Sequence, residues 1–150
     1  MTPFKIVPTV GVGPLRFGMT RDQVSRALGD PDSIEQNDEY GREDWCYEVA
    51  GIEVTFSEDW AWQLESVQAI KPVVELDGSQ LIGLTEKELY GLAPSGQIVL
   101  EFESTNVREH EWDASGLTFW VEDGRVRSLS AGPRWDANGE FPLWPAANDE

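Results

Sequence analysis

The sequence has few of the residues on which most metal sites and nucleophilic enzymes depend. It contains one cysteine, Cys46, and one histidine, His110. A single cysteine cannot form an internal disulfide, and one of each cannot supply a zinc site of the usual four-ligand spacing. Cys46 has no expected basic neighbour that would favour the reactive thiolate, so a nucleophilic role is the minor interpretation. We predict no cofactor and no metal.

Long apolar runs are also missing. No stretch approaches the roughly 20 apolar residues that cross a bilayer. The N-terminal "MTPFKIVPTVGVG" lacks the basic region and the long apolar core of a secretion signal. We therefore expect a cytoplasmic protein that is not bound to a membrane.

Basic residues are scarce, with 11 Lys and Arg against 28 Asp and Glu and a net charge of −17. The segment from Asp30 to Glu65 has 12 acidic residues and a single base, Arg42. Nucleic-acid binding needs clustered Lys and Arg, so we exclude it. Two interpretations remain, a solvated acidic surface that aids solubility and an electrostatic field that attracts a basic protein partner.

One pattern occurs twice in the chain. "FGMTRDQVSRALGDP" begins at Phe17, and "IGLTEKELYGLAP" begins at Ile82. In the first copy Thr20 precedes Gln23 by three residues, and in the second Thr85 precedes Glu88 likewise, as in the capping box that opens a helix. Each copy continues with apolar residues at helical spacing and ends at Gly or Pro. The pattern predicts two short helices.

Strand-like segments follow each predicted helix at matching distances. "GIEVTF" at 51–56 and "GLTFWV" at 116–121 each come after a partner strand, and "LESVQA" and "VRSLSA" follow them. We predict an α+β fold of two tandem helix-plus-four-strand repeats, forming one curved antiparallel sheet with the helices on its convex face. Within a single domain at 1–150, repeat one covers about 11–71, repeat two about 76–136, and a Pro-rich aromatic tail 137–150. We expect Phe141 and Trp144 in this tail to pack back on the body.

Turn geometry assigns side chains to faces. If Ala50-Gly51 is a two-residue hairpin turn, the predicted pairs are Val49–Ile52, Tyr47–Val54 and Trp45–Phe56, all facing the helices. By the same logic the inward residues of the second repeat are His110, Trp112, Ala114, Leu117, Phe119 and Val121. For His110 we expect a packed or capping role.

The opposite face of the sheet is predicted to be acidic around one indole. Its residues are Cys46, Glu48, Glu53, Thr55, Glu111, Asp113, Thr118 and Trp120, and we expect Glu101 and Glu103 to join them. Trp60 and Trp62 lie in the hairpin at Ser57–Gln63 beside this face. They either project for binding or fold back over the sheet edge.

Two segments resemble a known family. "FGMTRDQV" and "LTFWVEDGRVRSLSAGPRWD", which ends at Asp136, resemble the β-lactamase inhibitory protein family, and a looser likeness runs to the single repeat of small outer-membrane assembly lipoproteins. The resemblance implies two tandem repeats, a concave sheet that grips a protein partner, and no catalysis. It also implies that a hairpin of the first repeat inserts an acidic residue into the partner. The equivalent stretch, Asn37–Asp44, offers Asp38, Glu39 and Tyr40.

These observations favour a non-enzymatic intracellular inhibitor that binds a basic protein, most concretely an immunity protein neutralising a bacterial toxin. The expected partner-binding residues are Trp120, Trp60, Trp62, Glu48, Glu53, Glu111, Asp113, Asp38, Glu39 and Tyr40. One alternative is a small hydrolase of glycans or other small molecules, using paired carboxylates from Glu48, Glu53, Glu111 and Asp113. Another is an envelope-associated structural module. A deep pocket with two facing carboxylates would favour the hydrolase.

Overall fold

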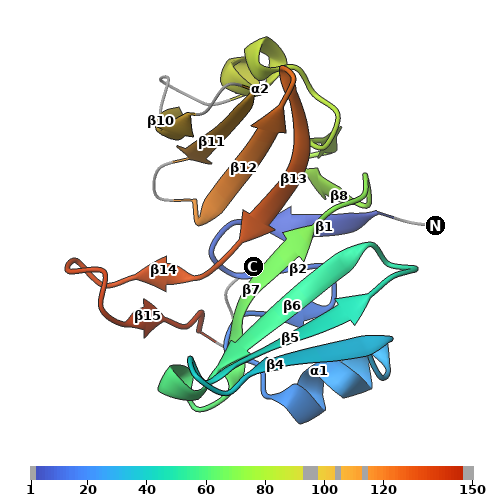
Figure 1. The fold of residues 1–150 in the computed structure, drawn as a ribbon, viewed down its shortest axis with the longest axis vertical. Coiled ribbons are helices and arrows are strands. Elements are labelled where there is room, and N and C mark those ends of the chain that lie inside the picture. The colour runs from blue at the N-terminus through green and yellow to red at the C-terminus, as the bar shows by residue number, and fades with distance from the viewer. Residues whose placement is uncertain (1–2, 93–97, 104–105, 113–114, 147–150) are drawn as a thin grey trace.

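The computed structural model describes residues 3–92, 98–103, 106–112 and 115–146, with the strand but not the side chains given at 98–103. Three helical segments occur in this part of the chain: α1 (Arg21–Leu28), the 3-10 turn η1 (Glu58–Trp60) and α2 (Glu86–Leu92). All other regular structure is β (Figure 1).

The largest sheet has eight antiparallel strands in the order β10-β11-β12-β13-β7-β6-β5-β4. In chain order they are β4 (Ser33–Asn37), β5 (Arg42–Tyr47), β6 (Ile52–Ser57), β7 (Gln63–Ala69), β10 (Ile98–Glu103), β11 (Val107–Trp112), β12 (Leu117–Glu122) and β13 (Arg125–Ala131). Strands β7 and β13 meet in its middle, where Ser130 lies opposite Gln68.

Two smaller sheets complete the fold. One has the order β3-β2-β1-β8-β9. Its strands are β1 (Phe4–Val7), β2 (Gly11–Val12), β3 (Leu15–Arg16), β8 (Val74–Leu76) and β9 (Ser79–Gln80). The other is the hairpin of β14 (Arg134–Trp135) and β15 (Pro142–Leu143). In Figure 1 the five-stranded sheet lies behind the large sheet and the β14–β15 hairpin projects to the left.

This architecture shows that the predicted fold class is wrong. The described part of the chain is mostly β, with two short helices and one 3-10 turn, and it forms three sheets where one was expected. It is therefore not an α+β fold of two helix-plus-four-strand repeats. The two-repeat prediction failed because the matching distances between similar segments show only that those segments are alike. They do not show which strands pair in space. Nothing local indicates that Phe4 pairs in parallel with Val74, a contact between residues distant in sequence that creates the five-stranded sheet.

Both predicted capping boxes are confirmed. The Gln23 amide donates to Thr20 Oγ1 at 3.2 Å, and the Thr20 amide donates to Gln23 Oε1 at 2.8 Å. In α2 the Glu88 amide donates to Thr85 Oγ1 at 3.2 Å, and the Thr85 amide donates to Glu88 Oε1 at 3.1 Å. These bonds satisfy amides that the first turn of a helix leaves without an intrahelical partner.

The predicted hairpin registers are wrong by two residues. Tyr47 lies opposite Ile52, and Trp112 lies opposite Leu117, so each turn has four residues where two were expected. Gly51 ends the first turn with φ +72°, a conformation that favours glycine. Val49 consequently lies in the turn and is 81% exposed, which contradicts its predicted core position. Ala114 lies outside the described residues.

A register shift of two residues does not change which face a strand residue points to, because strand side chains alternate with period two. The remaining strand residues therefore lie on their predicted faces. The core therefore contains the expected apolar set on β5, β6 and β12, joined by the five-stranded sheet. Its buried members are Ile6, Val12, Leu15, Phe17, Val24, Trp45, Tyr47, Ile52, Val54, Phe56, Leu64, Val67, Ala69, Val74, Leu76, Leu81, Ile82, Leu89, Leu117, Phe119, Val121, Val126, Leu129 and Ala131.

One charged side chain also faces the core. Glu43 is 6% exposed and lies opposite Phe56. Its carboxylate accepts hydrogen bonds from Trp45 Nε1 at 2.7 Å, Arg21 Nη1 at 3.2 Å and Gln36 Nε2 at 3.2 Å. A buried carboxylate is tolerated only when it is paired and hydrogen-bonded. Glu43 thus joins α1 to β4 and β5, a role the sequence did not indicate.

Candidate binding face of the large sheet

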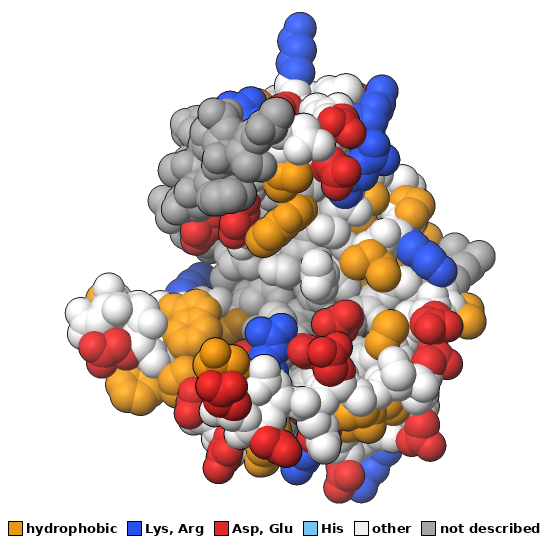
Figure 2. Space-filling view, in the orientation of Figure 1, with side chains coloured by type: hydrophobic (Ala, Val, Ile, Leu, Met, Phe, Trp, Pro, Cys, Tyr) orange, Lys and Arg blue, Asp and Glu red, His pale blue; other side chains and the backbone are white. Residues whose placement is uncertain are grey.

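The large sheet covers the core with one face and leaves the other open. On β12, Leu117, Phe119 and Val121 are buried, whereas Trp120 is 44% exposed and Glu122 is exposed. The predicted outward direction of Trp120 is therefore confirmed. Figure 2 shows this open face, which is hollowed in the middle, with acidic side chains gathered beside the hollow.

A row of side chains crosses the open face in register. It runs from Glu111 through Thr118, Ser130, Gln68 and Glu53 to Cys46. Glu111 and Glu53 stand four strand spacings apart, or roughly 19 Å at about 4.8 Å per strand. The two carboxyls of a glycosidase lie about 5–10 Å apart. Glu53 and Glu111 are therefore too far apart to act as the paired carboxylates of the predicted hydrolase.

The remaining two carboxylates of that set lie elsewhere. Glu48 is exposed in the β5–β6 turn, where its amide donates to Asp32 Oδ2 at 2.7 Å. Asp113 lies outside the described residues, as do the side chains of Glu101 and Glu103. The structure thus places Glu53, Glu111 and Trp120 on one face and Glu48 at its rim.

An acidic cluster surrounds Arg42 at the β5–β6 end of the open face. Asp44 accepts from Arg42 Nε at 3.1 Å and from the Thr55 hydroxyl at 2.6 Å. Burial raises the pKa of Glu53, and the nearby Asp44 carboxylate raises it further against the opposing effect of Arg42. Burial also raises the pKa of Glu65, while Arg42 and a hydrogen bond from Trp60 act in the opposite direction. Because carboxylates outnumber basic groups here, the electrostatic potential at this end of the face is negative.

A shallow hollow of about 440 Å³ lies beside this cluster, over β7, β12 and β13. We call it the β14 hollow, because Trp135 of β14 forms one wall. Its lining residues are Glu65, Ser66, Glu111, Gly116, Thr118, Ser130, Ala131, Gly132, Pro133 and Trp135. It combines carboxylates, hydroxyls and one indole.

Aromatic side chains stand next to the β14 hollow. Trp60 packs edge-to-face on Trp135 with ring centroids 5.6 Å apart, and on Phe141 at 6.0 Å. Trp135 is 39% exposed and Phe141 is 58% exposed. We call these three residues the aromatic cluster. It is a partly exposed apolar surface at the border of the open face.

Trp60 and Trp62 belong to the same hairpin but pack against different parts of the protein. Ala61 and Trp62 both adopt the left-handed conformation after η1, with φ +55° and +59°. This turns Trp62 back against the core, where the Arg21 guanidinium lies 4.7 Å from its ring centroid. Of the two tryptophans, Trp60 joins the aromatic cluster and Trp62 packs inward.

The three candidates from the first hairpin form its exposed tip. Asp38, Glu39 and Tyr40 are all exposed, with Tyr40 at 69%, and the Tyr40 amide donates to Asn37 Oδ1 at 3.3 Å. The Glu58 amide donates to the Gly41 carbonyl at 2.8 Å, which holds this tip beside η1. The tip therefore lies at the same end of the molecule as the aromatic cluster.

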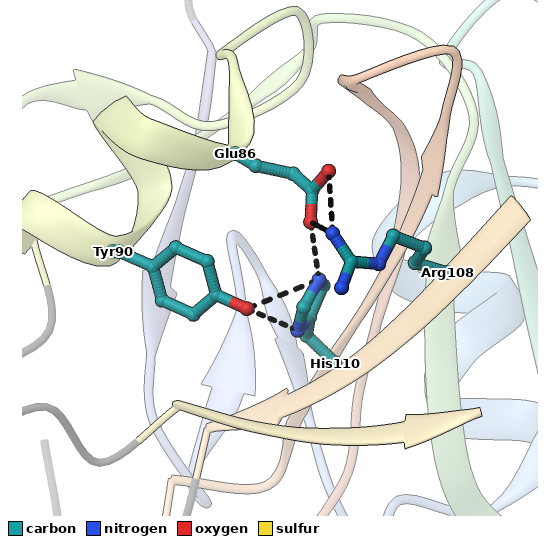
Figure 3. A network of polar contacts seen from close by, with 4 residues as sticks. All are labelled: Glu86, Tyr90, Arg108 and His110. Carbon is teal, nitrogen blue, oxygen red and sulfur yellow. Dashed lines mark hydrogen bonds and ion pairs between the residues drawn. The ribbon is translucent and has the colours of Figure 1, made fainter. Parts of the chain in front are cut away.

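His110 is fully buried, at 0% exposed, on the predicted inward side of β11. Its Nε2 lies 2.9 Å from Glu86 Oε2, and its Nδ1 lies 3.0 Å from the Tyr90 hydroxyl (Figure 3). Arg108 Nη1 donates to the same Glu86 carboxylate at 3.0 Å. Burial raises the pKa of Tyr90, and the Glu86 charge adds to this effect. The network fastens α2 to β11 away from the open face.

Sequence reasoning missed Glu65, Trp135 and the outward role of Phe141. Glu65 lies at an irregularity of the β6–β7 register, between the pairs Thr55–Ser66 and Phe56–Leu64. Both tail aromatics pack back on the body as expected, Trp144 on the core and Phe141 on Trp60, but Phe141 remains 58% exposed. Hydrophobic pattern alone does not separate these two aromatics. Only the path of the β14–β15 hairpin does.

Two features are absent from the described part of the chain. No group of three or more His, Cys, Asp or Glu side chains there is arranged to hold a metal ion. Within the same residues, no helix has the length and apolar character needed to span a membrane.

No protein-family model and no curated protein matches the sequence. The solved structures that resemble the fold include the following two. One is an extracellular protein containing an SCP domain from Bacillus anthracis strain Ames, with a TM-score of 0.55 and 12% identity over 78% of this chain and 44% of that chain. The other is the uncharacterized protein yfeY from Escherichia coli, with a TM-score of 0.55 and 13% identity over 87% of this chain and 99% of that chain.

The chain therefore spans less than half of the Bacillus protein, and identities of 12% and 13% show a shared fold alone. Neither structure is described as a β-lactamase inhibitory protein, so that resemblance stays a prediction. The cytoplasmic location stays a prediction as well, because one of the similar structures is extracellular.

Proposed function

We propose that the protein is a non-enzymatic binding protein that captures a cationic protein on the open face of its large sheet. In its most concrete form it is an inhibitor, an immunity protein that neutralises a basic toxin. The observation that carries the proposal is the exposed indole of Trp120 on a polar, acidic sheet face that no helix or strand of the described residues covers.

Trp120 has the surroundings of an interface anchor. It stands between Glu109 on β11 and Ser128 on β13, while its strand neighbours Phe119 and Val121 fill the core. Placing an indole outward in water is unfavourable, since apolar surface contributes roughly 25 cal/mol per Å² when buried. Tryptophan ringed by polar groups is enriched at binding hot spots. The strand pairings on both sides of β12 hold this side chain outward, where a partner could contact it.

The charge of the face selects the partner class. Glu53 and Glu65 each interact electrostatically with Asp44, and Arg42 is the opposing charge for both. Carboxylates whose ionised form is disfavoured by burial and by one another gain when a positive surface approaches. The same field, in a chain of net charge −17, speeds encounter with a basic protein at low salt.

The test compares Trp120→Ala with Val49→Ala, a smaller apolar truncation in an exposed turn. The protein is immobilised through a terminal tag so that Cys46 on the open face stays unmodified. A protein captured from the native cell is then purified, and its affinity and its own activity are measured with each variant. We expect Trp120→Ala to weaken binding by about tenfold or more and Val49→Ala by less than about twofold.

Two further readouts decide the proposal. Binding weakens between about 0.05 M and about 0.5 M NaCl, because screening acts on exposed charges. The partner's activity falls in proportion to bound wild-type protein. Equal affinity of Trp120→Ala and wild type, or affinity that is independent of salt, would refute capture through this face.

A further inference from the structure

We propose that the β14 hollow is a receptor site for an arginine side chain presented by the partner. This inference rests on the proposed function and names the chemistry of its anchor. Trp135 supplies an aromatic wall, Glu65 supplies a carboxylate, and the Ser66, Thr118 and Ser130 side chains supply polar lining.

The wall and the carboxylate are positioned before any ligand arrives. Trp135 packs edge-to-face on Trp60 at 72°, which fixes its orientation relative to the sheet. The side chain of Trp60 also donates a hydrogen bond to the Glu65 carboxylate. Trp60 thus contacts both the Trp135 ring and the Glu65 carboxylate. Because these two side chains are already held in place, little side-chain entropy is lost when a ligand binds.

Electrostatics favours a cation in this position. The Glu65 carboxylate is partly withdrawn from water, and the nearby Asp59 and Asp44 charges disfavour its ionisation further. The positive charge of Arg42 on β5 acts in the opposite direction and lowers the pKa of Glu65. A second positive group entering from solvent would stabilise the ionised carboxylate, as opposite charges do at short range.

The mixture of groups favours a guanidinium over an ammonium. A guanidinium is planar, stacks on indole rings and donates to a carboxylate in a forked geometry. An ammonium is more strongly hydrated and makes no planar stack. Sugars also stack on tryptophan and bond hydroxyls, so a saccharide is the competing ligand class in the test.

The experiment uses the full chain labelled with ¹⁵N and short capped peptides. The probes are acetyl-Gly-Arg-Gly-amide, its lysine counterpart and its citrulline counterpart, which keeps the shape and lacks the charge. Chitotriose serves as the saccharide probe. Indole cross-peaks of Trp135 and Trp60 are assigned from the Trp135→Phe and Trp60→Phe variants. We expect the arginine peptide to shift the Trp135 indole and the Ser66 and Gly132 amides saturably, with a millimolar dissociation constant.

Glu65→Gln and Glu35→Gln form a matched pair, because each replaces one carboxylate of the open face and, of these two residues, Glu65 lines the hollow and Glu35 does not. We expect Glu65→Gln to raise the dissociation constant at least about threefold and Glu35→Gln to leave it within about 1.5-fold. The citrulline peptide should bind at least about tenfold more weakly than the arginine peptide, and the lysine peptide should fall between them.

Equal shifts with arginine and citrulline, equal effects of the two variants, or chitotriose binding more tightly than arginine would each overturn the site. So would unshifted Trp135 and Gly132 signals at saturating peptide. These outcomes are separable from the function proposed above. Partner capture that still depends on Trp120 and on salt would leave that function standing without an arginine anchor in the hollow.

Discussion

Glu43 and Glu65 are two carboxylates withdrawn from water in different ways. Glu43 faces the core and accepts from three donors, on Trp45, Arg21 and Gln36. Glu65 faces the β14 hollow, accepts from Trp60, and has a pKa raised chiefly by burial. The Glu43 oxygens have their donors within the fold, whereas burial puts the ionised form of Glu65 at a cost that a ligand can relieve.

This difference leads to a prediction for Glu65→Gln. The pKa of Glu65 is higher in the folded than in the unfolded protein, so its contribution to stability is complete below the unfolded value, about 4.3, and is lost as pH rises through the folded value. The amide does not ionise. We therefore expect the variant to have a higher free energy of unfolding than wild type at about pH 7, with the difference vanishing below about pH 4.

Urea denaturation at several pH values measures this effect. Glu39→Gln is the control, because Glu39 lies in the exposed tip of the β4–β5 hairpin. Its difference from wild type should stay small and nearly independent of pH. A Glu65→Gln protein that is less stable than wild type at neutral pH would show that ionised Glu65 is stabilised by contacts within the fold.

At the scale of single elements, α2 is a short helix that depends on tertiary contacts. It has seven residues, and isolated helices of that length are marginal in water. Leu89 is buried at 0% exposed, and Glu86 bonds both His110 and Arg108 on β11. Capping at Thr85 begins the helix, and the Glu86 network fastens it to the sheet.

We predict that Glu86→Ala lowers the free energy of unfolding by about 1–3 kcal/mol, because it leaves the buried His110 and the Arg108 guanidinium without this acceptor. Lys87→Ala, at the next and exposed position, should change it by less than about 0.5 kcal/mol. Thermal and urea unfolding measure both. Equal effects of the two variants would show that the network adds nothing beyond helix propensity.

The elements also show where sequence reasoning was sufficient. Thr20 and Thr85 open helices because each hydroxyl and the side chain three residues later form bonds within one turn, so no distant residue is needed. The lengths of the two hairpin turns were not predicted correctly from the sequence. Gly51 ends its four-residue turn at φ +72°, and a Cβ at this position would stand 2.7 Å from the Cβ of Lys71. Lys71 is a distant neighbour that the turn sequence does not specify.

For the whole molecule, charge is the dominant property. A net charge of −17 on 150 residues destabilises the compact state by self-repulsion. We therefore expect Tm to rise between about 0.02 M and about 0.5 M NaCl at neutral pH, where the Debye length falls well below the size of the protein. Differential scanning calorimetry measures the shift. A Tm that is constant or falls with salt would show that ion pairs such as Arg21–Glu43 outweigh the repulsion.

Alternation and local capping were enough to predict the two helix starts, the inward set around Phe119 and the outward indole of Trp120. These features depend on residues that are neighbours along the chain, where the period of the backbone dictates direction. The five-stranded sheet, the buried position of Glu43, and the meeting of Glu65 with Trp60 and Trp135 depend on pairings between distant segments. Local sequence does not encode which distant strand comes to lie alongside, so the three sheets and the β14 hollow became visible only in the folded chain.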